Sequence, residues 1–298
     1  MTFSVTQSGA PCGAIVEGID LTKQLNRSQV KALRQEWLRS HVLIFPNQAL
    51  SDDDLERYSL YFGHFGYDPF IGPIDGRDHV VAVERKADEQ APVFAEVWHS
   101  DWSFQEVPPA GTCLYSIKIP PIGGDTGYIN QHKALAEMPT ELRKKIEGKT
   151  AIHSARAGYS PDGYFGNEEQ EADRSMRIIV SEEARDTRRH PIIRRHPETG
   201  VEGLFGCFGY IIGIEGMSDD ESRELLMELY NWQTRDEFIY RHNWQENMLV
   251  MWDNRSVLHK ANGGYDGYDR LLHRTTIAEQ SIAEQTVAEQ TVAEQTVA

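Results

Sequence analysis

The chain has 298 residues, and its 40% hydrophobic and 10% aromatic side chains are typical of a folded globular protein and not of a disordered one. The formal net charge of −16 argues against a nucleic-acid partner, because phosphate binding needs a basic face. Three widely spaced cysteines indicate no disulfide framework, and no signal peptide or membrane-spanning stretch stands out, so we expect a cytoplasmic protein.

The first part of the chain alternates short strands and short helices. Residues 13–21 predict a strand and a turn. Residues 26–40 predict a helix capped by Asn26, with one apolar stripe made of Val30, Leu33, Trp37 and Leu38. The run "HVLIFP" predicts a buried strand, and the helix that follows has Ser51 as its N-cap and acidic residues in its first turn.

From residue 110 onward, short β-type runs separated by turn residues dominate the sequence. This pattern predicts a mainly β protein with flanking helices, a sandwich or jelly roll. Residues 160–186 are polar and charged, and indicate a solvated insertion or a mobile lid. From residue 277 a five-residue unit repeats; it forms no apolar stripe on a helix, so residues 278–298 are predicted to be a low-complexity tail.

The stretch "EVWHSDWSF" carries the strongest chemical signal. On a strand, His99 and Asp101 would point to one face and Ser100 to the other, which favours two metal ligands over a Ser/His/Asp triad. The run "MWDNRSVLH" offers His259 as a third ligand. Two imidazoles and one carboxylate leave open positions on a metal, as non-haem Fe(II) oxygenases require. Seven other histidines are interpreted as core or surface residues: His64, His132, His153, His190, His196, His242 and His273.

Two arginines follow, Arg270 and Arg274. If the open positions hold 2-oxoglutarate, then the cluster of Fe(II), Asp101 and the dicarboxylate has one excess negative charge. A nearby arginine would neutralise it and could grip the far carboxylate with two hydrogen bonds.

These motifs, in this order, resemble the taurine dioxygenase family (TauD/TfdA-type Fe(II)/2-oxoglutarate-dependent dioxygenases). The resemblance rests on "WHSDWSFQEVPPAGTCLYSIKIPPIGGDT", "LVMWDNRSVLHKAN" and "RLLHRTTI", and extends over residues 1–277 as one dioxygenase domain. It implies a double-stranded β-helix, usually as a homodimer or tetramer. It also implies that Fe(II) is held by His99, Asp101 and His259, that 2-oxoglutarate is held by Thr126 and Arg270, and that Arg274 lies near the primary substrate.

Three positions depart from the family pattern at the substrate site. Asp68 or a neighbour replaces a sulfonate-binding histidine, Trp102 replaces a valine, and Tyr210 supplies the pocket aromatic. A carboxylate would repel a sulfonate, and Trp102 would fill space, which argues against taurine itself and favours a larger or amine-bearing substrate at least as much. The resemblance still indicates a small acid, namely a sulfonate, a carboxylate or a sulfate ester, hydroxylated with O₂ while 2-oxoglutarate becomes succinate and CO₂.

Two other classes of function stay open from the sequence. A non-catalytic metal- or ligand-binding barrel could have kept the fold, since function does not follow from fold. A metal-dependent hydrolase could also use a His/His/Asp set, although Thr126 and Arg270 would then have no role.

Overall fold

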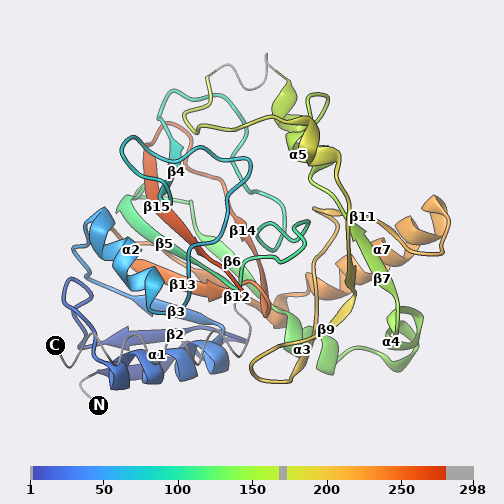
Figure 1. Cartoon of the computed structure of the whole chain (residues 1–298), viewed down its shortest axis with the longest axis horizontal. Helices are drawn as coiled ribbons and strands as arrows, with labels where there is room; N and C mark the ends of the chain where they lie inside the picture. Colours follow the sequence, from blue (N-terminus) through green and yellow to red (C-terminus); the bar gives the residue numbers. More distant parts are fainter. Residues whose placement is uncertain (1–2, 168–172, 280–298) are drawn as a thin grey trace.

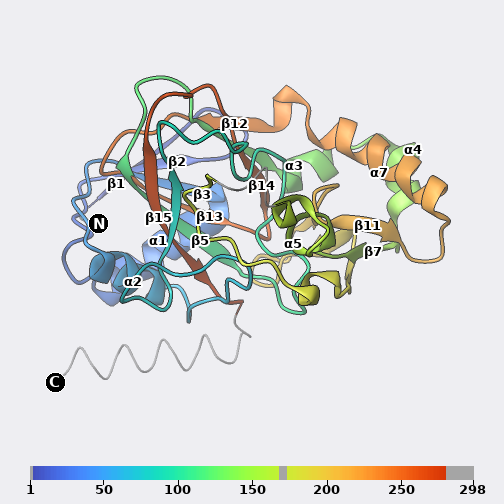
Figure 2. The same cartoon turned by 90° about the horizontal axis from the view of Figure 1, so that it is seen from above.

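The computed structural model describes residues 3–167 and 173–279. The fold is mixed α/β with several antiparallel sheets (Figures 1 and 2), and the largest sheet has seven strands. In spatial order these strands are β1 (Ser4–Gln7), β2 (Ala14–Glu17), β3 (Val42–Phe45), β13 (Leu249–Asp253), β5 (Gly111–Lys118), β15 (Arg270–Ile277) and β4 (Val81–Arg85). Among their pairings, β2 with β3 is parallel and the others are antiparallel.

Three smaller sheets complete the β structure. One is made of β12 (Ile239–His242), β6 (Thr126–Asn130) and β14 (Val257–Ala261); the next of β11 (Ile211–Ile214), β7 (Thr150–His153) and β8 (Arg188–Pro191); the last of β10 (Glu202–Leu204) and β9 (Ile193–Arg195). The first of these, here called the small sheet, carries part of the candidate site.

The helices lie on two flanks of the molecule. In both views α1 and α2 lie beside the large sheet and α4 and α7 lie on the opposite flank (Figures 1 and 2). The helical segments are α1 (Arg27–Ser40), α2 (Asp52–Leu60), α3 (Gln131–Ala136), α4 (Thr140–Ile146), α5 (Arg156–Tyr159), α7 (Asp219–Gln233) and the short 3₁₀ turns η1 (Tyr164–Gly166), η2 (Glu182–Arg185) and η3 (Asp236–Phe238).

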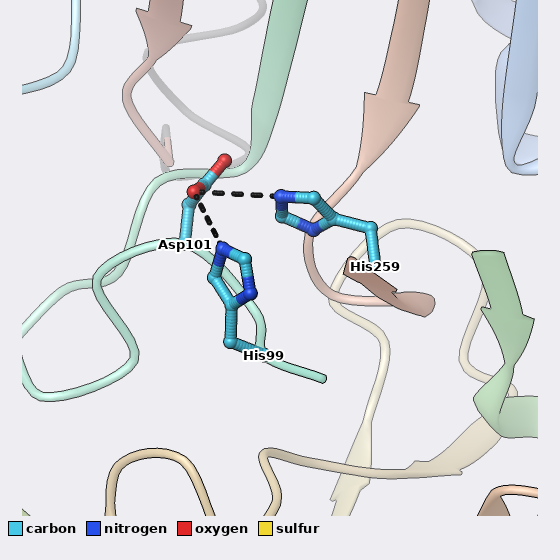
Figure 3. Close-up of side chains that lie close together, drawn as sticks. All are labelled: His99, Asp101 and His259. Carbon is cyan, nitrogen blue, oxygen red and sulfur yellow. Dashed lines mark ion pairs between the residues drawn. The ribbon is translucent and has the colours of Figure 1, made fainter. Parts of the chain in front are cut away.

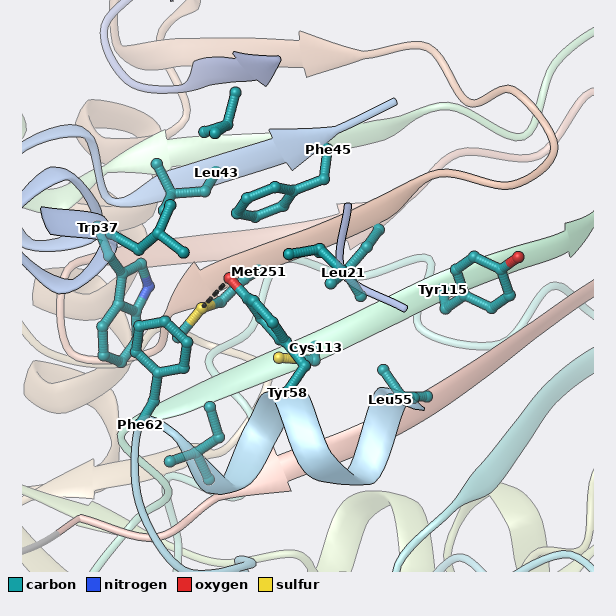
Figure 4. Close-up of a cluster of buried hydrophobic side chains, with 14 of the residues drawn as sticks. Leu21, Trp37, Leu43, Phe45, Leu55, Tyr58, Phe62, Cys113, Tyr115 and Met251 are labelled. Carbon is teal, nitrogen blue, oxygen red and sulfur yellow. Dashed lines mark hydrogen bonds between the residues drawn. The ribbon is translucent and has the colours of Figure 1, made fainter. Parts of the chain in front are cut away.

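The large sheet is covered on both faces, which explains the unbroken apolar run in β3. Leu43 and Phe45 belong to the core beneath α1 and α2, with Trp37, Tyr58 and Met251 (Figure 4). The alternate residues of β3, Val42 and Ile44, belong to a second core cluster that also takes in residues of the small sheet. A strand buried on both faces reads as a continuous hydrophobic run instead of alternating with polar residues.

The sequence predictions for the N-terminal helices are confirmed. The side chain of Asn26 caps α1, that of Ser51 caps α2, and each forms a reciprocal capping box with the third helical residue. The prediction of mainly β structure after residue 110 was incomplete, because α3, α4 and α7 also lie in this part of the chain. The signal for α7 was present in Ser218 and Glu221, which form its capping box.

The predicted polar insertion is partly packed. Ile178 bridges to Ile71, and the backbone N–H of Ile179 donates to the carbonyl of Phe70 at 2.9 Å. Met176 and Ala184 are buried in the aromatic cluster that contains Phe70. The predicted repeat tail falls, from residue 280 onward, outside the described residues. Among the described helices, none has the length and apolarity needed to cross a bilayer.

Candidate metal centre and active site

Three potential metal ligands converge at one buried point. One ligand atom from each of His99, Asp101 and His259 lies within 4.8 Å of the others, and all three residues are buried. Nε2 of each histidine lies 3.7 Å from Oδ1 of Asp101 (Figure 3). These separations are too long for hydrogen bonds, so the imidazole nitrogens and the carboxylate oxygen face a common space.

The geometry that brings them together differs from the strand predicted for "WHSDW". His99 forms only an isolated β-bridge, with its N–H donating to the carbonyl of His259 at 3.0 Å and the reverse bond at 2.8 Å. The chain then turns at Asp101, and Trp102 has a left-handed φ of 47°. The bridge therefore pairs the two histidines directly, while the turn swings the carboxylate of Asp101 toward them. The hydroxyl of Ser100, between His99 and Asp101, donates to the carbonyl of Asn254 at 2.7 Å.

Both histidines are set up as neutral ligands. Burial lowers the pKa of His99 below its usual value; burial, together with the nearby His99, lowers the pKa of His259 to about 3. Nδ1 of His99 lies 2.8 Å from the carbonyl of Val97, a contact that requires the proton on Nδ1 and leaves the Nε2 lone pair facing Asp101. Nδ1 of His259 is buried and meets no hydrogen-bond partner among the described residues.

The carboxylate of Asp101 is ionised and oriented by a chain of hydrogen bonds. Burial opposes its ionisation, but His259, Arg274 and His99 outweigh that effect and hold the pKa below its usual value. Thr112 Oγ1 donates to Oδ2 at 2.6 Å and accepts from Asn254 Nδ2 at 2.9 Å.

Trp252 Nε1 in turn donates to Asn254 Oδ1 at 2.9 Å. Because Oδ2 is engaged, Oδ1 is the oxygen left for a metal. Thr112 and Asn254 were not predicted from the sequence, although Asn254 follows "WD" in the motif that contains His259.

The ligands open into a pocket between the large and the small sheet. Its volume is about 440 Å³, including space open to solvent. Its lining combines side chains from both sheets and from the segment before Asp101: Val83, Phe94, Ala95, His99, Leu114, Thr126, Trp252, His259, Ala261, Arg270 and Arg274. Five residues predicted from the sequence therefore share this wall, namely His99, Thr126, His259, Arg270 and Arg274.

Arg270 lies in this pocket without a carboxylate partner in the described part of the chain. Its Nε is buried without a hydrogen bond, and Nη2 makes only a long 3.4 Å contact to the carbonyl of Gly124. Burial lowers its pKa. Gly124 has a φ of 68°, and a Cβ there would lie 3.3 Å from Nε of Arg270, so the "GGDT" turn makes room for the guanidinium. Thr126 follows in the same turn and accepts a hydrogen bond from Trp244 Nε1 at 2.9 Å.

Arg274 differs in having a carboxylate partner, although its Nε, like that of Arg270, is buried without a hydrogen bond among the described residues. Nη2 donates to Oδ1 of Asp68, Nη1 lies 3.6 Å from Oδ1 of Asp101, and the guanidinium lies over the ring of Trp102 at 5.4 Å. Tyr210 lies edge-on to His99, with ring centroids 6.2 Å apart. Asp68, Trp102, Tyr210 and Arg274 therefore gather beside the metal ligands, as predicted, but the carboxylate of Asp68 is paired with the arginine.

This set of groups fits a divalent metal with open coordination positions. Two neutral imidazoles and one carboxylate form the donor set of non-haem Fe(II) oxygenases, and the unpartnered Arg270 supplies a positive charge within the same pocket. Residues that could hold a bound dicarboxylate are Arg270 and the hydroxyl of Thr126.

Comparison with known proteins gives the same picture. Residues 4–276 match the model of the family described as "Taurine catabolism dioxygenase TauD, TfdA family". The chain is 32% identical to an alkylsulfatase of Acinetobacter baylyi, over 89% of this chain and 82% of the relative. It is 30% identical to the alpha-ketoglutarate-dependent 2,4-dichlorophenoxyacetate dioxygenase of Cupriavidus pinatubonensis, over 89% of this chain and 94% of the relative.

Among solved structures, a taurine dioxygenase from Burkholderia xenovorans superposes with a TM-score of 0.77 at 29% identity, covering 94% of this chain and 92% of that one. The structural match implies a jelly-roll fold. Because the family model spans almost the whole described chain and the metal ligands meet in space, this chain belongs to the TauD/TfdA family of alpha-ketoglutarate-dependent dioxygenases.

Proposed function

We propose that the chain hydroxylates a small organic substrate with O₂ while 2-oxoglutarate is converted to succinate and CO₂. One oxygen atom enters the substrate and the other enters succinate, so no further reductant is needed. The observation that carries the proposal is the convergence of His99, Asp101 and His259 beside a pocket that also holds Arg270, an arginine with no carboxylate partner among the described residues. Fe(II), bound by these ligands, would supply the oxidative chemistry.

Each residue has a separate task in this proposal. His99 and His259 offer neutral Nε2 atoms, and Thr112 turns one oxygen of Asp101 away so that the other faces the metal. Arg270 would bind the far carboxylate of 2-oxoglutarate, helped by the hydroxyl of Thr126. The excess negative charge of Fe(II), Asp101 and 2-oxoglutarate is then cancelled by the guanidinium.

The resemblance further leads us to propose a double-stranded β-helix, a homodimer or tetramer, and a cytoplasmic location. An acidic substrate needs separate consideration. Relatives named for 2,4-dichlorophenoxyacetate and for sulfate esters support one. An acid, however, requires a cation that is free to bind it, and Arg274 is already paired with Asp68. For this reason the proposed reaction does not specify an acidic substrate.

Anaerobic reconstitution tests the reaction. Fe(II) and 2-oxoglutarate should together produce a weak visible charge-transfer band, and added O₂ should convert 2-oxoglutarate to succinate. The His99→Ala variant should lose both signals, whereas His64→Ala, which changes an exposed histidine away from the ligands, should keep them. A protein that binds metal but shows neither band nor succinate would instead be a sensor. Hydrolysis of esters without 2-oxoglutarate would indicate the metal-dependent hydrolase.

A further inference from the structure

We propose that Asp68 determines substrate specificity by closing Arg274 to external anions, so that the primary substrate is an uncharged molecule with an apolar body. This inference rests on the proposed function, because it concerns the substrate beside the same metal. It departs from the small acid that the family resemblance indicated.

The first argument is the saturation of Asp68. Its Oδ1 accepts from Arg274 and, at 2.7 Å, from Trp102 Nε1, while its Oδ2 accepts from Thr276 Oγ1 at 3.0 Å. The side chains of Asp68 and Arg274 are only 9% and 6% exposed. Asp68 therefore accepts three hydrogen bonds at a site with little solvent, and it acts as a preformed internal ligand of Arg274. An incoming anion would have to displace Asp68 and leave its carboxylate buried without a cation.

The second argument is that the backbone holds Asp68 in place. The N–H of Gly66 donates to the carbonyl of Thr276 at 2.9 Å, and Phe65 bridges to Ile277. A Cβ on Gly66 would lie 2.8 Å from Oγ1 of Thr276, so this close approach of the loop to β15 requires glycine. The carboxylate is therefore positioned by a loop that is pinned to the same strand that carries Arg274.

The third argument is the charge of the loaded site. Fe(II), 2-oxoglutarate, Asp101 and Arg270 together sum to zero. A free Arg274 would add one positive charge and attract an anion, but Asp68 cancels it. An anion brought to Arg274 would also approach the carboxylates of Asp68 and Asp101, and this repulsion is strong in a poorly solvated pocket. Apart from the histidines, the basic side chains that line the pocket are Arg270 and Arg274.

The fourth argument is the apolar surface around the pair. Trp102, Phe104 and Tyr159 are buried in one cluster, and Tyr210 packs on Phe104 with ring centroids 5.0 Å apart. The pocket beside this cluster is itself lined by the apolar side chains of Val83, Phe94, Ala95, Leu114 and Ala261, and such a lining favours an uncharged, apolar ligand.

Matched probes that differ only in charge test the inference. Isothermal titration calorimetry at pH 7.5, on protein loaded with Mn(II) and 2-oxoglutarate, would compare phenylacetate with phenylacetamide and benzenesulfonate with benzenesulfonamide. We expect the wild-type protein to bind each amide at least tenfold more tightly than its acid. In Asp68→Asn, the affinity for at least one acid should rise by tenfold or more, while the affinity for the amides stays within about threefold.

The control is Thr276→Val, which removes one hydrogen bond to Asp68 but keeps its charge. It should not admit the acids, so a gain seen only in Asp68→Asn separates charge from packing. If Asp68→Asn does not fold, as judged by its melting curve, Asp68→Ser should show the same gain. Wild-type binding of an acid as tight as that of its amide, or no gain for either acid in the variants, overturns the inference.

Failure of the proposed function gives a different result. The titrations need no turnover, so anion binding gained by Asp68→Asn in a protein that never consumes 2-oxoglutarate would support the role of Asp68 and defeat the dioxygenase reaction.

Discussion

Arg270 and Arg274 lie four residues apart on β15, on the same face of the strand, and both are buried, yet among the described residues Arg274 has a carboxylate partner and Arg270 has none. Burial lowers the pKa of Arg270 and outweighs the nearby Asp125, which raises it. For Arg274 burial acts in the same direction, but Asp68 and Asp101 outweigh it and raise the pKa. A buried arginine therefore marks an anion site only when the protein has not already supplied the anion.

The largest expected effect is on the stability of the metal-free protein. Arg274→Met should lower the free energy of unfolding by about 3–5 kcal/mol, because Asp68 is left buried without its cation. Arg270→Met should be neutral or stabilising, since it removes a buried charge that has no internal carboxylate partner among the described residues. Urea denaturation of the two variants measures both values. Equal destabilisation would show that the two arginines are equivalent, contrary to the comparison.

The next prediction concerns the affinity for 2-oxoglutarate, which substitution of Arg270 should lower more than substitution of Arg274. Arg270→Gln should weaken 2-oxoglutarate binding to the Mn(II)-loaded protein by about 100-fold, the cost of removing one partner of a buried charge pair. Arg270→Lys should recover only part of the affinity, because lysine cannot form the two parallel hydrogen bonds. Calorimetry gives the dissociation constants.

The matched control is Arg274→Gln, which should stay within about threefold of the wild-type affinity for 2-oxoglutarate. If Arg274→Gln lowers the affinity for 2-oxoglutarate as much as Arg270→Gln does, our assignment of Arg270 as the anchor of the dicarboxylate is wrong. If neither variant loses affinity, neither residue is its anchor.

Local signals in the sequence were enough for the helix caps and for choosing the three residues that converge in the structure, His99, Asp101 and His259. Asn26 and Ser51 act within three residues of themselves, so their role can be read directly. The geometry of His99 and Asp101 could not be read from the sequence, because a bridge to His259 and a turn that begins at Asp101 replace the expected strand. The predicted strand was wrong, but the convergence of ligands that it was meant to explain is present.

Interactions between distant segments account for what the sequence could not show. Asp68 and Arg274 are 206 residues apart, so the sequence presented Asp68 only as a charge that would repel a sulfonate. The structure shows that this carboxylate is first of all the partner of Arg274. Thr112 was missed for the same reason, since a threonine on a strand shows no sign of the carboxylate that it orients.

The smallest expected effect tests whether the loss of folding stability at acidic pH comes from buried histidines and not from the charged groups around Arg274. Burial lowers the pKa of His153 from 6.5 to about 3. As the pH falls from 7 to 5, the unfolded chain therefore takes up a proton that the folded chain refuses, and stability decreases by about 1.4 kcal/mol per pH unit below 6.5 for this group. His153→Gln should reduce the slope of unfolding free energy against pH by that amount, as measured by urea denaturation at several pH values. Arg274→Met should lower stability but keep the contribution of His153 to this slope, because the guanidinium itself stays charged in both states and any change of slope would come from Asp68 and Asp101. A slope that falls in Arg274→Met but not in His153→Gln would assign the acid sensitivity to the carboxylates around Arg274.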